Sequence, residues 1–122
     1  MGYVQGFVIP VPVANRDAYR DMAARTASIF REYGAERVVE CWGDALPDGR
    51  STDFRKAVKA EEGETVVFSW IVWPDRATCD DAHDRIWADP RMAVGDAPIP
   101  FDSKRMIYGG FVPIFDTGAD QS

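Results

Sequence analysis

The stretch Val66–Trp73 constrains the fold of this chain more than any other segment. Its residues are almost all β-branched or aromatic, and Gly63 and Pro74 stand near its two ends, which predicts a strand. Side chains alternate between the two faces of a strand, and here both faces are apolar. A strand with one wet face would alternate apolar and polar residues instead. The stretch therefore predicts a central strand that is covered on both sides.

Length and charge narrow the class of protein. The chain has 122 residues, of which 46% are apolar, so we expect a single domain over residues 1–115, followed by a polar and mobile tail over residues 116–122. Its net charge of −6 disfavours nucleic acid and anionic membrane surfaces as partners. The apolar runs are too short to span a bilayer, and the N-terminus has no signal-peptide pattern. Two separated cysteines fit a reduced, cytoplasmic protein.

The rest of the chain predicts three further strands and two long helices. One helix follows the N-cap Asn15 and ends at Gly34, and the other follows Asp75 and ends at Pro90. The other predicted elements are strands at Tyr3–Pro12, Glu36–Trp42 and Lys104–Phe115, and a short helix at Phe54–Ala60 capped by Thr52-Asp53. Gly109-Gly110 in the last strand suggests a bulge or a close backbone approach.

This order of elements predicts an α+β fold of the ferredoxin-like β-α-β-β-α-β type, with a four-stranded antiparallel sheet. Two helices cover one face of such a sheet, which leaves the second apolar face of Val66–Trp73 without cover. The simplest cover is a second copy of the chain, sheet against sheet about a two-fold axis. The space between the sheets would be either a cavity or a closed core, and the sequence leaves both open.

Several segments carry a family resemblance that spans nearly the whole chain apart from the tail. They are residues 38–44, 47–49, 52–64, 66–71, 89–92 and 104–111, among them Pro47-Asp48-Gly49 and Lys104-Arg105-Met106-Ile107-Tyr108-Gly109-Gly110-Phe111. Together they resemble the YbaA-like bacterial family of unknown function. The resemblance implies a dimeric α/β barrel built from ferredoxin-like subunits, which agrees with the argument from strand faces. It brings no reaction, no cofactor and no catalytic residues.

Glu40, Trp42 and Trp70 are the first candidates for a site. Glu40 in mid-strand shares a face with Trp42, and the carboxylate could act as a base in the cavity between the sheets. Trp42 and Trp70 could line a pocket for an aromatic ligand. The structural alternatives are an edge carboxylate paired with Arg37, and ordinary core aromatics.

Arg105 and Tyr108 on the last predicted strand are the other candidates. Arg105 could bind a carboxylate, and the Tyr108 hydroxyl could hydrogen-bond a substrate oxygen. Their spacing of three places them on opposite faces of a regular strand. The alternative for Arg105 is a salt bridge at an edge or between subunits.

The single histidine, His83, stands on the apolar stripe of the second long helix, with Asp80 and Asp84 one turn or less away. A general base, a metal ligand and a half-buried structural histidine are all compatible with this position, although stable metal sites use three or four convergent ligands. Nucleotide-binding loops, the zinc motif HExxH and the nucleophile motif GxSxG are missing from the sequence. We therefore predict neither a metal nor a cofactor.

Two hypotheses of function remain open from the sequence. In the first, the protein is a homodimer whose inter-sheet cavity binds a small molecule without catalysis. In the second, it is a cofactor-independent enzyme that acts on a small apolar or aromatic substrate, with Glu40 as the base and Arg105 and Tyr108 orienting an oxygen. The monooxygenase or isomerase kind of reaction is what the resemblance implies, through the fold that the wider superfamily shares. Whether the chain is an enzyme is undecided at this point.

Overall fold

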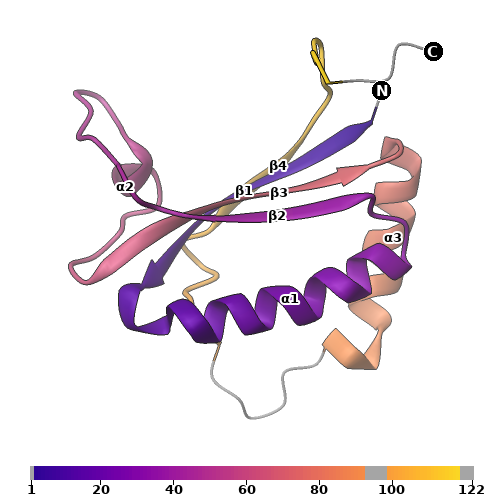
Figure 1. Cartoon of the computed structure of the whole chain (residues 1–122), viewed down its shortest axis with the longest axis horizontal. Coiled ribbons are helices and arrows are strands. Elements are labelled where there is room, and N and C mark those ends of the chain that lie inside the picture. The colour runs from indigo at the N-terminus through magenta and orange to yellow at the C-terminus, as the bar shows by residue number, and fades with distance from the viewer. Residues whose placement is uncertain (1, 93–98, 119–122) are drawn as a thin grey trace.

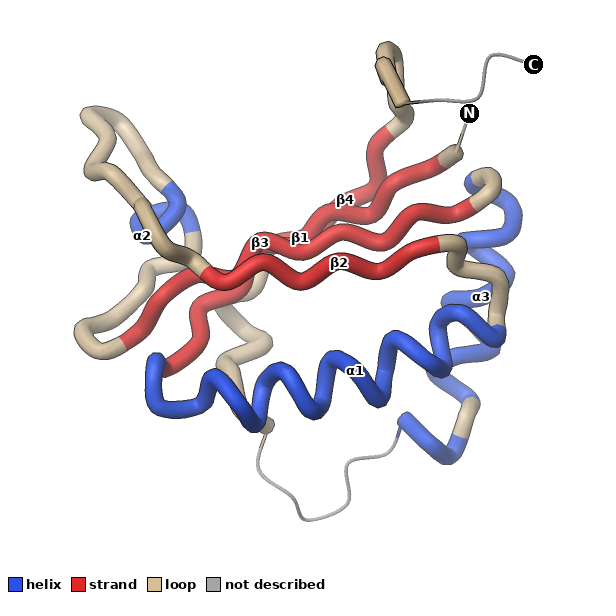
Figure 2. Tube along the Cα trace, in the orientation of Figure 1, coloured by secondary structure: helices blue, strands red, loops and turns tan. Residues whose placement is uncertain are grey.

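The computed structural model describes residues 2–92 and 99–118. The strands β1 (Tyr3–Pro12), β2 (Arg37–Trp42), β3 (Glu64–Trp73) and β4 (Ile107–Phe111) form one sheet in the order β2-β3-β1-β4. All neighbouring strands are antiparallel. The helices α1 (Arg16–Glu32) and α3 (Arg76–Ala88) lie on one side of this sheet (Figures 1 and 2). This confirms the α+β fold and its ferredoxin-like order of elements.

Two helix starts agree with their predicted caps, and one does not. The side chain of Asp75 accepts a hydrogen bond from the backbone N–H of Thr78 at 2.7 Å, and α2 (Phe54–Ala57) begins in the same way after Asp53. Asn15 stands before α1, but its side chain does not cap the helix: its backbone, at φ −97° and ψ 14°, continues a 3-10 turn over Val13–Asn15, and its amide donates to the carbonyl of Pro100 at 3.1 Å. Gly34 ends α1 with a φ of 112°, a conformation that favours glycine.

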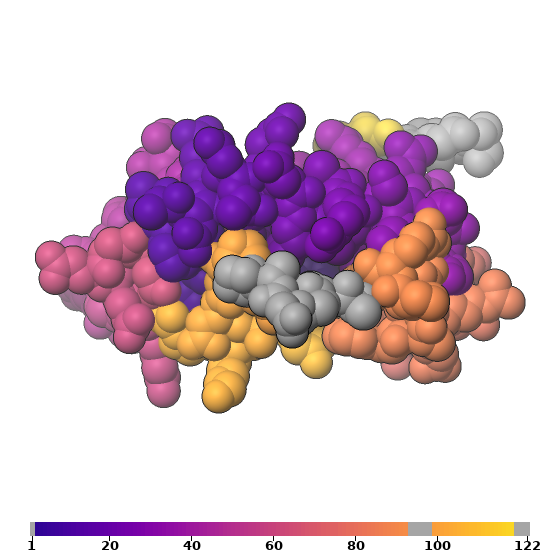
Figure 3. All heavy atoms as spheres, turned by 90° about the horizontal axis from the view of Figure 1, so that it is seen from below, coloured from indigo at the N-terminus to yellow at the C-terminus, as the bar shows by residue number. Residues whose placement is uncertain are grey.

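The helices cover only alternate residues of the central strand β3. Thr65, Val67, Ser69, Ile71 and Trp73 are buried beneath them. Val67 packs with Ile9, Val11, Tyr19 and Ala23 under α1, and Ile71 and Trp73 pack with Cys79, Ala82 and Ile86 of α3. In the space-filling view from the helix side, α1 and α3 occupy much of the surface (Figure 3). Most of the core thus lies between the sheet and these helices, while Val66 and its partner Pro10, on the other face of the sheet, are buried as well.

The last strand is shorter than predicted and has no bulge. It spans Ile107–Phe111 rather than Lys104–Phe115, and its pairing with β1 runs without interruption from Val8↔Ile107 to Val4↔Phe111. A Cβ atom on Gly110 would collide with the hydroxyl of Tyr3, so the close approach is made by a side chain and not by backbone. Ile114 is 94% exposed and lies beyond the sheet.

The cap of α3 provides a test of this packing. We expect Asp75→Ala to lower the melting temperature by a few degrees, because the backbone N–H of Thr78 loses its acceptor and no helical partner replaces it. The N–H of Thr78 holds the pKa of Asp75 below its usual range, so this contribution is present at neutral pH and is lost as the pH falls through the lowered pKa. Thermal unfolding at pH 7 measures the effect. Asp81→Ala, which removes only an exposed ion pair with Arg85, should change the melting temperature much less.

Candidate functional site

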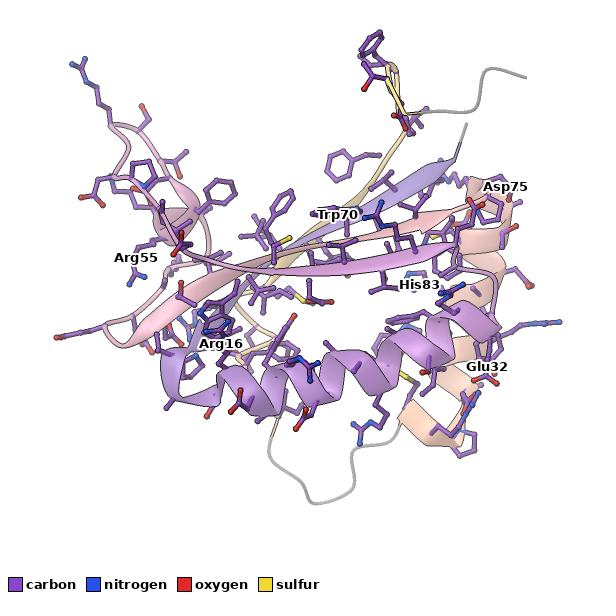
Figure 4. All side chains as sticks on the ribbon, viewed as in Figure 1. Arg16, Glu32, Arg55, Trp70, Asp75 and His83 are labelled. Atoms are coloured by element: carbon purple, nitrogen blue, oxygen red, sulfur yellow. The ribbon has the colours of Figure 1, made fainter. Side chains whose placement is uncertain are left out.

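The face of the sheet that points away from α1 and α3 is built from three cross-strand rows, which we call the open face. The rows are Arg37, Val72, Val4 and Phe111; Val39, Trp70, Gly6 and Gly109; and Cys41, Phe68, Val8 and Ile107. Trp70 lies on this side of the sheet, opposite α1 (Figure 4). The segment that carries α2 and the segment after β4 both rise on this side, at opposite ends of the sheet (Figure 1).

A hollow of about 770 Å³ occupies the open face. Its lining is mostly apolar and includes Val4, Val8, Phe68, Trp70, Ile107 and Phe111. Its floor contains Gly6 and Gly109, which are paired across β1 and β4 in the same row as Trp70. Because glycine carries no side chain, two positions of the middle row leave space above the backbone. The hollow therefore depends on the two glycines at positions 6 and 109 and on the strand register that pairs them.

Aromatic rings surround this hollow. The ring of Phe54 in α2 meets the ring of Phe68 edge to face, with centroids 6.1 Å apart. The ring centroids of Phe68 and Trp70 are 5.7 Å apart. On the other side, the ring of Phe111 leans over the floor, where it would come within 3.3 Å of a Cβ atom on Gly6 and 3.7 Å of one on Gly109. This arrangement can bind an apolar or aromatic group by contact and stacking.

The charged side chains that line the hollow, within the described residues, are Arg37 and Asp116. Arg37 begins β2 at one edge of the sheet, and Asp116 follows β4 at the other edge. Both lie at the end of the sheet marked by the row of Val72, Val4 and Phe111. The middle of the hollow is thus apolar, with one positive and one negative group at opposite corners of a single end.

Glu40 and Trp42 lie on the other face of the sheet, and our expectation that they face the space between two sheets is wrong. The Glu40 carboxylate accepts hydrogen bonds from the Tyr19 hydroxyl of α1 at 2.6 Å and from the Ser69 hydroxyl of β3 at 2.9 Å. Trp42 faces α1 as well, with the guanidinium of Arg16 at 5.7 Å from its ring centroid. Both residues line a smaller groove of about 330 Å³ between α1 and β2.

The contacts of Glu40 connect α1 to the sheet. Burial, and next the negative charge of Glu40, raise the pKa of Tyr19 well above its usual range, so its hydroxyl keeps its proton and continues to donate. Each carboxylate oxygen of Glu40 accepts one hydroxyl group. Glu40 is thus on the opposite side of the sheet from Trp70, and the structure does not bring the two together in one site.

Arg105 lies before β4 and forms the centre of an ion cluster. Its guanidinium donates two hydrogen bonds to the Glu64 carboxylate at 2.7 and 2.8 Å, one to Asp102 at 2.8 Å and one to the carbonyl of Lys59 at 2.9 Å. These contacts tie the segment before β4 to the start of β3. The guanidinium is occupied by these partners, which is the edge salt bridge that the sequence left as the alternative role.

Tyr108 borders the hollow, but its ring stacks on Phe7 with centroids 6.2 Å apart and is 69% exposed. Phe7 belongs to the helix-facing side of β1, since it alternates with Gly6 and Val8. The structure therefore does not bring Tyr108 together with Arg105 or Glu40. The proposed roles of these residues in catalysis remain untested predictions.

His83 takes part in a partly buried chain of side-chain hydrogen bonds. The indole N–H of Trp73 donates to the Gln5 side-chain carbonyl at 2.8 Å, so the amide nitrogen of Gln5 points to Nε2 of His83 and donates to it. His83 faces the core between β1 and α3 and not the hollow. Within residues 2–92 and 99–118, no three metal-binding side chains converge, and no helix is long and apolar enough to cross a membrane.

Sequence reasoning missed Gly6, Gly109 and Arg37 as parts of a site. The sequence predicts a bulge or a close backbone approach at Gly109 but no binding site, and Gly6 in the middle of β1 is the signal that points to one. A glycine inside a strand often marks a place where another group approaches the backbone. Only the register, which sets Gly6 opposite Gly109 and beside Trp70, turns these two glycines into one floor.

Comparison with known proteins adds the family. Residues 2–103 match the family model described as a protein of unknown function, DUF1428. The chain belongs to the DUF1428 family. It is also 56% identical, over 116 residues, to the uncharacterized protein YbaA of Escherichia coli K12, a match that covers 95% of this chain and 99% of that protein. The YbaA protein of Shigella flexneri has the same identity and coverage. These matches confirm the resemblance seen in the sequence, and they bring to this DUF1428 protein no named reaction.

Proposed function

We propose that this DUF1428 protein is a homodimer in which two open faces meet and enclose a cavity that binds a small molecule. The observation that carries the proposal is the apolar open face with its hollow of about 770 Å³. Phe68 is 45% exposed, Ile107 46% and Phe111 60% in the single chain. Contiguous exposed apolar surface of this kind marks an interaction site, since removing it from water is favourable.

The charges at the rim support a particular two-fold arrangement. A two-fold axis that runs in the interface and parallel to the strands lays the β2 edge of one subunit over the β4 edge of its partner, at the same end. Arg37 of one subunit then meets Asp116 of the partner subunit, and the reverse pair forms at the other edge. A face is self-complementary in a homodimer when such opposite charges exchange places.

The enzyme hypothesis receives less support from the geometry. It requires Glu40 beside the bound substrate, yet Glu40 bonds Tyr19 and Ser69 on the opposite side of the sheet. Arg105, the residue meant to orient an oxygen, is held by Glu64 and Asp102. We therefore propose binding rather than catalysis as the function of the hollow.

Light scattering on a sizing column tests the assembly. We expect a dimer at micromolar concentration, and Arg37→Asp or Asp116→Arg alone should each raise its dissociation constant by about tenfold or more through like-charge contacts. The double variant that combines both reversals should restore the wild-type value. Arg20→Asp, on the exposed surface of α1, is the charge-matched control and should leave the dimer unchanged.

A monomer at these concentrations would contradict the proposed assembly. A different test is whether the loss in the free energy of dimerisation in the double variant equals the sum of the losses in the two single variants. That result would contradict the pairing of Arg37 with Asp116 of the partner subunit, while leaving the open face as the interface.

A further inference from the structure

We propose that the molecule bound in the hollow is a planar aromatic compound without net charge, seated between Trp70 and the ring of Phe111, on the part of the floor at Gly6 and Gly109 that this ring leaves open. This inference rests on the proposed function, because it names the class of ligand for the same cavity. Three observations carry it: the shape of the floor, the contact that Phe111 already makes with it, and the position of the charges.

The floor is flat because its two central positions have no side chains. Gly6 pairs with Trp70 on one side and with Gly109 on the other, so the peptide groups of this row take part in the strand ladders. Such a floor offers few free hydrogen-bond donors or acceptors. It offers a smooth surface on which the flat face of a ring makes more contact than a branched aliphatic group can.

The ring of Phe111 shows that this floor accepts an aromatic group. It approaches the Cβ directions of Gly6 and Gly109 at 3.3 and 3.7 Å, and Phe111 remains 60% exposed. One side of the ring is therefore applied to the floor while much of it still faces the hollow. A second ring placed between Phe111 and Trp70 would find aromatic surface on two sides, in the offset or edge arrangements that aromatic pairs prefer.

The charges disfavour an ionic ligand. Arg37 and Asp116 stand at the end of the hollow, and in the proposed dimer each is paired with the partner. A carboxylate or ammonium group in the middle would lie against Trp70, Val8 and Ile107, where an unpaired buried charge is costly. A neutral ligand has no such penalty.

A matched pair of probes tests the charge. We expect naphthalene-1-carboxamide to quench the fluorescence of the protein and to bind at least tenfold more tightly than 1-naphthoate, which has nearly the same shape and one negative charge. The fully hydrogenated, non-planar form of the carboxamide should bind more weakly than the planar one, which tests the preference for a flat ring. Calorimetry gives the three dissociation constants for the wild-type dimer.

A matched pair of variants tests where the ligand binds. Gly109→Val fills the floor with a residue that suits a strand and should weaken binding of the carboxamide at least tenfold. Ala24→Val is the control, since Ala24 is exposed on α1, on the opposite side of the sheet from the hollow, and it should leave binding unchanged. Phe111→Leu should also weaken binding, which covers the case in which Gly109→Val fails to fold.

The outcomes separate the two proposals. A wild-type dimer that binds none of the three probes, that prefers the carboxylate, or that binds the carboxamide equally well as Gly109→Val and Phe111→Leu would overturn the ligand class while the assembly stands. A monomer by light scattering would overturn the proposed function and this inference with it.

Discussion

Replacing Trp73 by alanine is expected to destabilise the protein by about 3–5 kcal/mol, the range for deletion of a large buried aromatic side chain. Trp73 has 0% exposure and packs against α3 in the core cluster. Its removal leaves a cavity and also removes the N–H donor of the Gln5 carbonyl, which is 8% exposed as a residue. Urea unfolding followed by circular dichroism measures the loss.

An exposed tryptophan and a conservative variant of Trp73 provide the controls for this prediction. Trp87 is 78% exposed, so Trp87→Ala should change the free energy of unfolding by less than about 1 kcal/mol. Trp73→Phe keeps most of the volume but removes the donor, and should cost about 1–3 kcal/mol because Gln5 is left with an unsatisfied carbonyl. If Trp73→Ala were no more destabilising than Trp87→Ala, the assignment of Trp73 to the core would be wrong.

Trp70 behaves differently from the expectation that it is a core aromatic of the single chain. It is partly buried and lies on the open face, so its removal affects the hollow and the proposed interface before it affects the helix-covered core. A stability loss from Trp70→Ala that depends on protein concentration would therefore reflect assembly.

Replacing Arg105 by glutamine is expected to give the second large effect, a fall in the midpoint of urea unfolding by roughly 1 M. The substitution removes both hydrogen bonds to Glu64, whose side chain is only 8% exposed, and the bond to Asp102. Glu64 is then a nearly buried carboxylate without its cation. Arg85→Gln, which removes an exposed pair with Asp81 at 3.5 Å, is the control and should have little effect.

The same cluster predicts how stability changes with pH. The guanidinium of Arg105 holds the pKa of Glu64 below its usual range, and that of Asp102 as well. A carboxyl group with a lowered pKa in the folded state contributes stability that is present above its unfolded pKa, and loses it as the pH falls through the folded pKa. Wild-type stability should therefore fall between about pH 5 and pH 3, and Arg105→Gln should show a shallower fall over that window. Equal slopes in the two proteins would contradict this account of the cluster.

The sequence by itself determined the order of elements, the caps at Asp53 and Asp75, and the end of α1 at Gly34, because these depend on residues close together in the chain. It also determined that β3 is apolar on both faces, which follows from alternation alone. Four strands, two long helices and one uncovered sheet face could thus be predicted without coordinates.

Only the tertiary structure decided which face each side chain takes. The alternation of side chains along β2 predicts that Glu40 and Trp42 share a face. Because Val39 pairs with Trp70 on the open face, Glu40 and Trp42 face the helices. In the same way, one step along β3 separates a fully buried Trp73 from Val72 on the open face. The hollow needs Gly6, Gly109 and Trp70 in one row, and these come from three strands far apart in the sequence. Register between distant strands is set by the whole packed sheet, and no local pattern contains it.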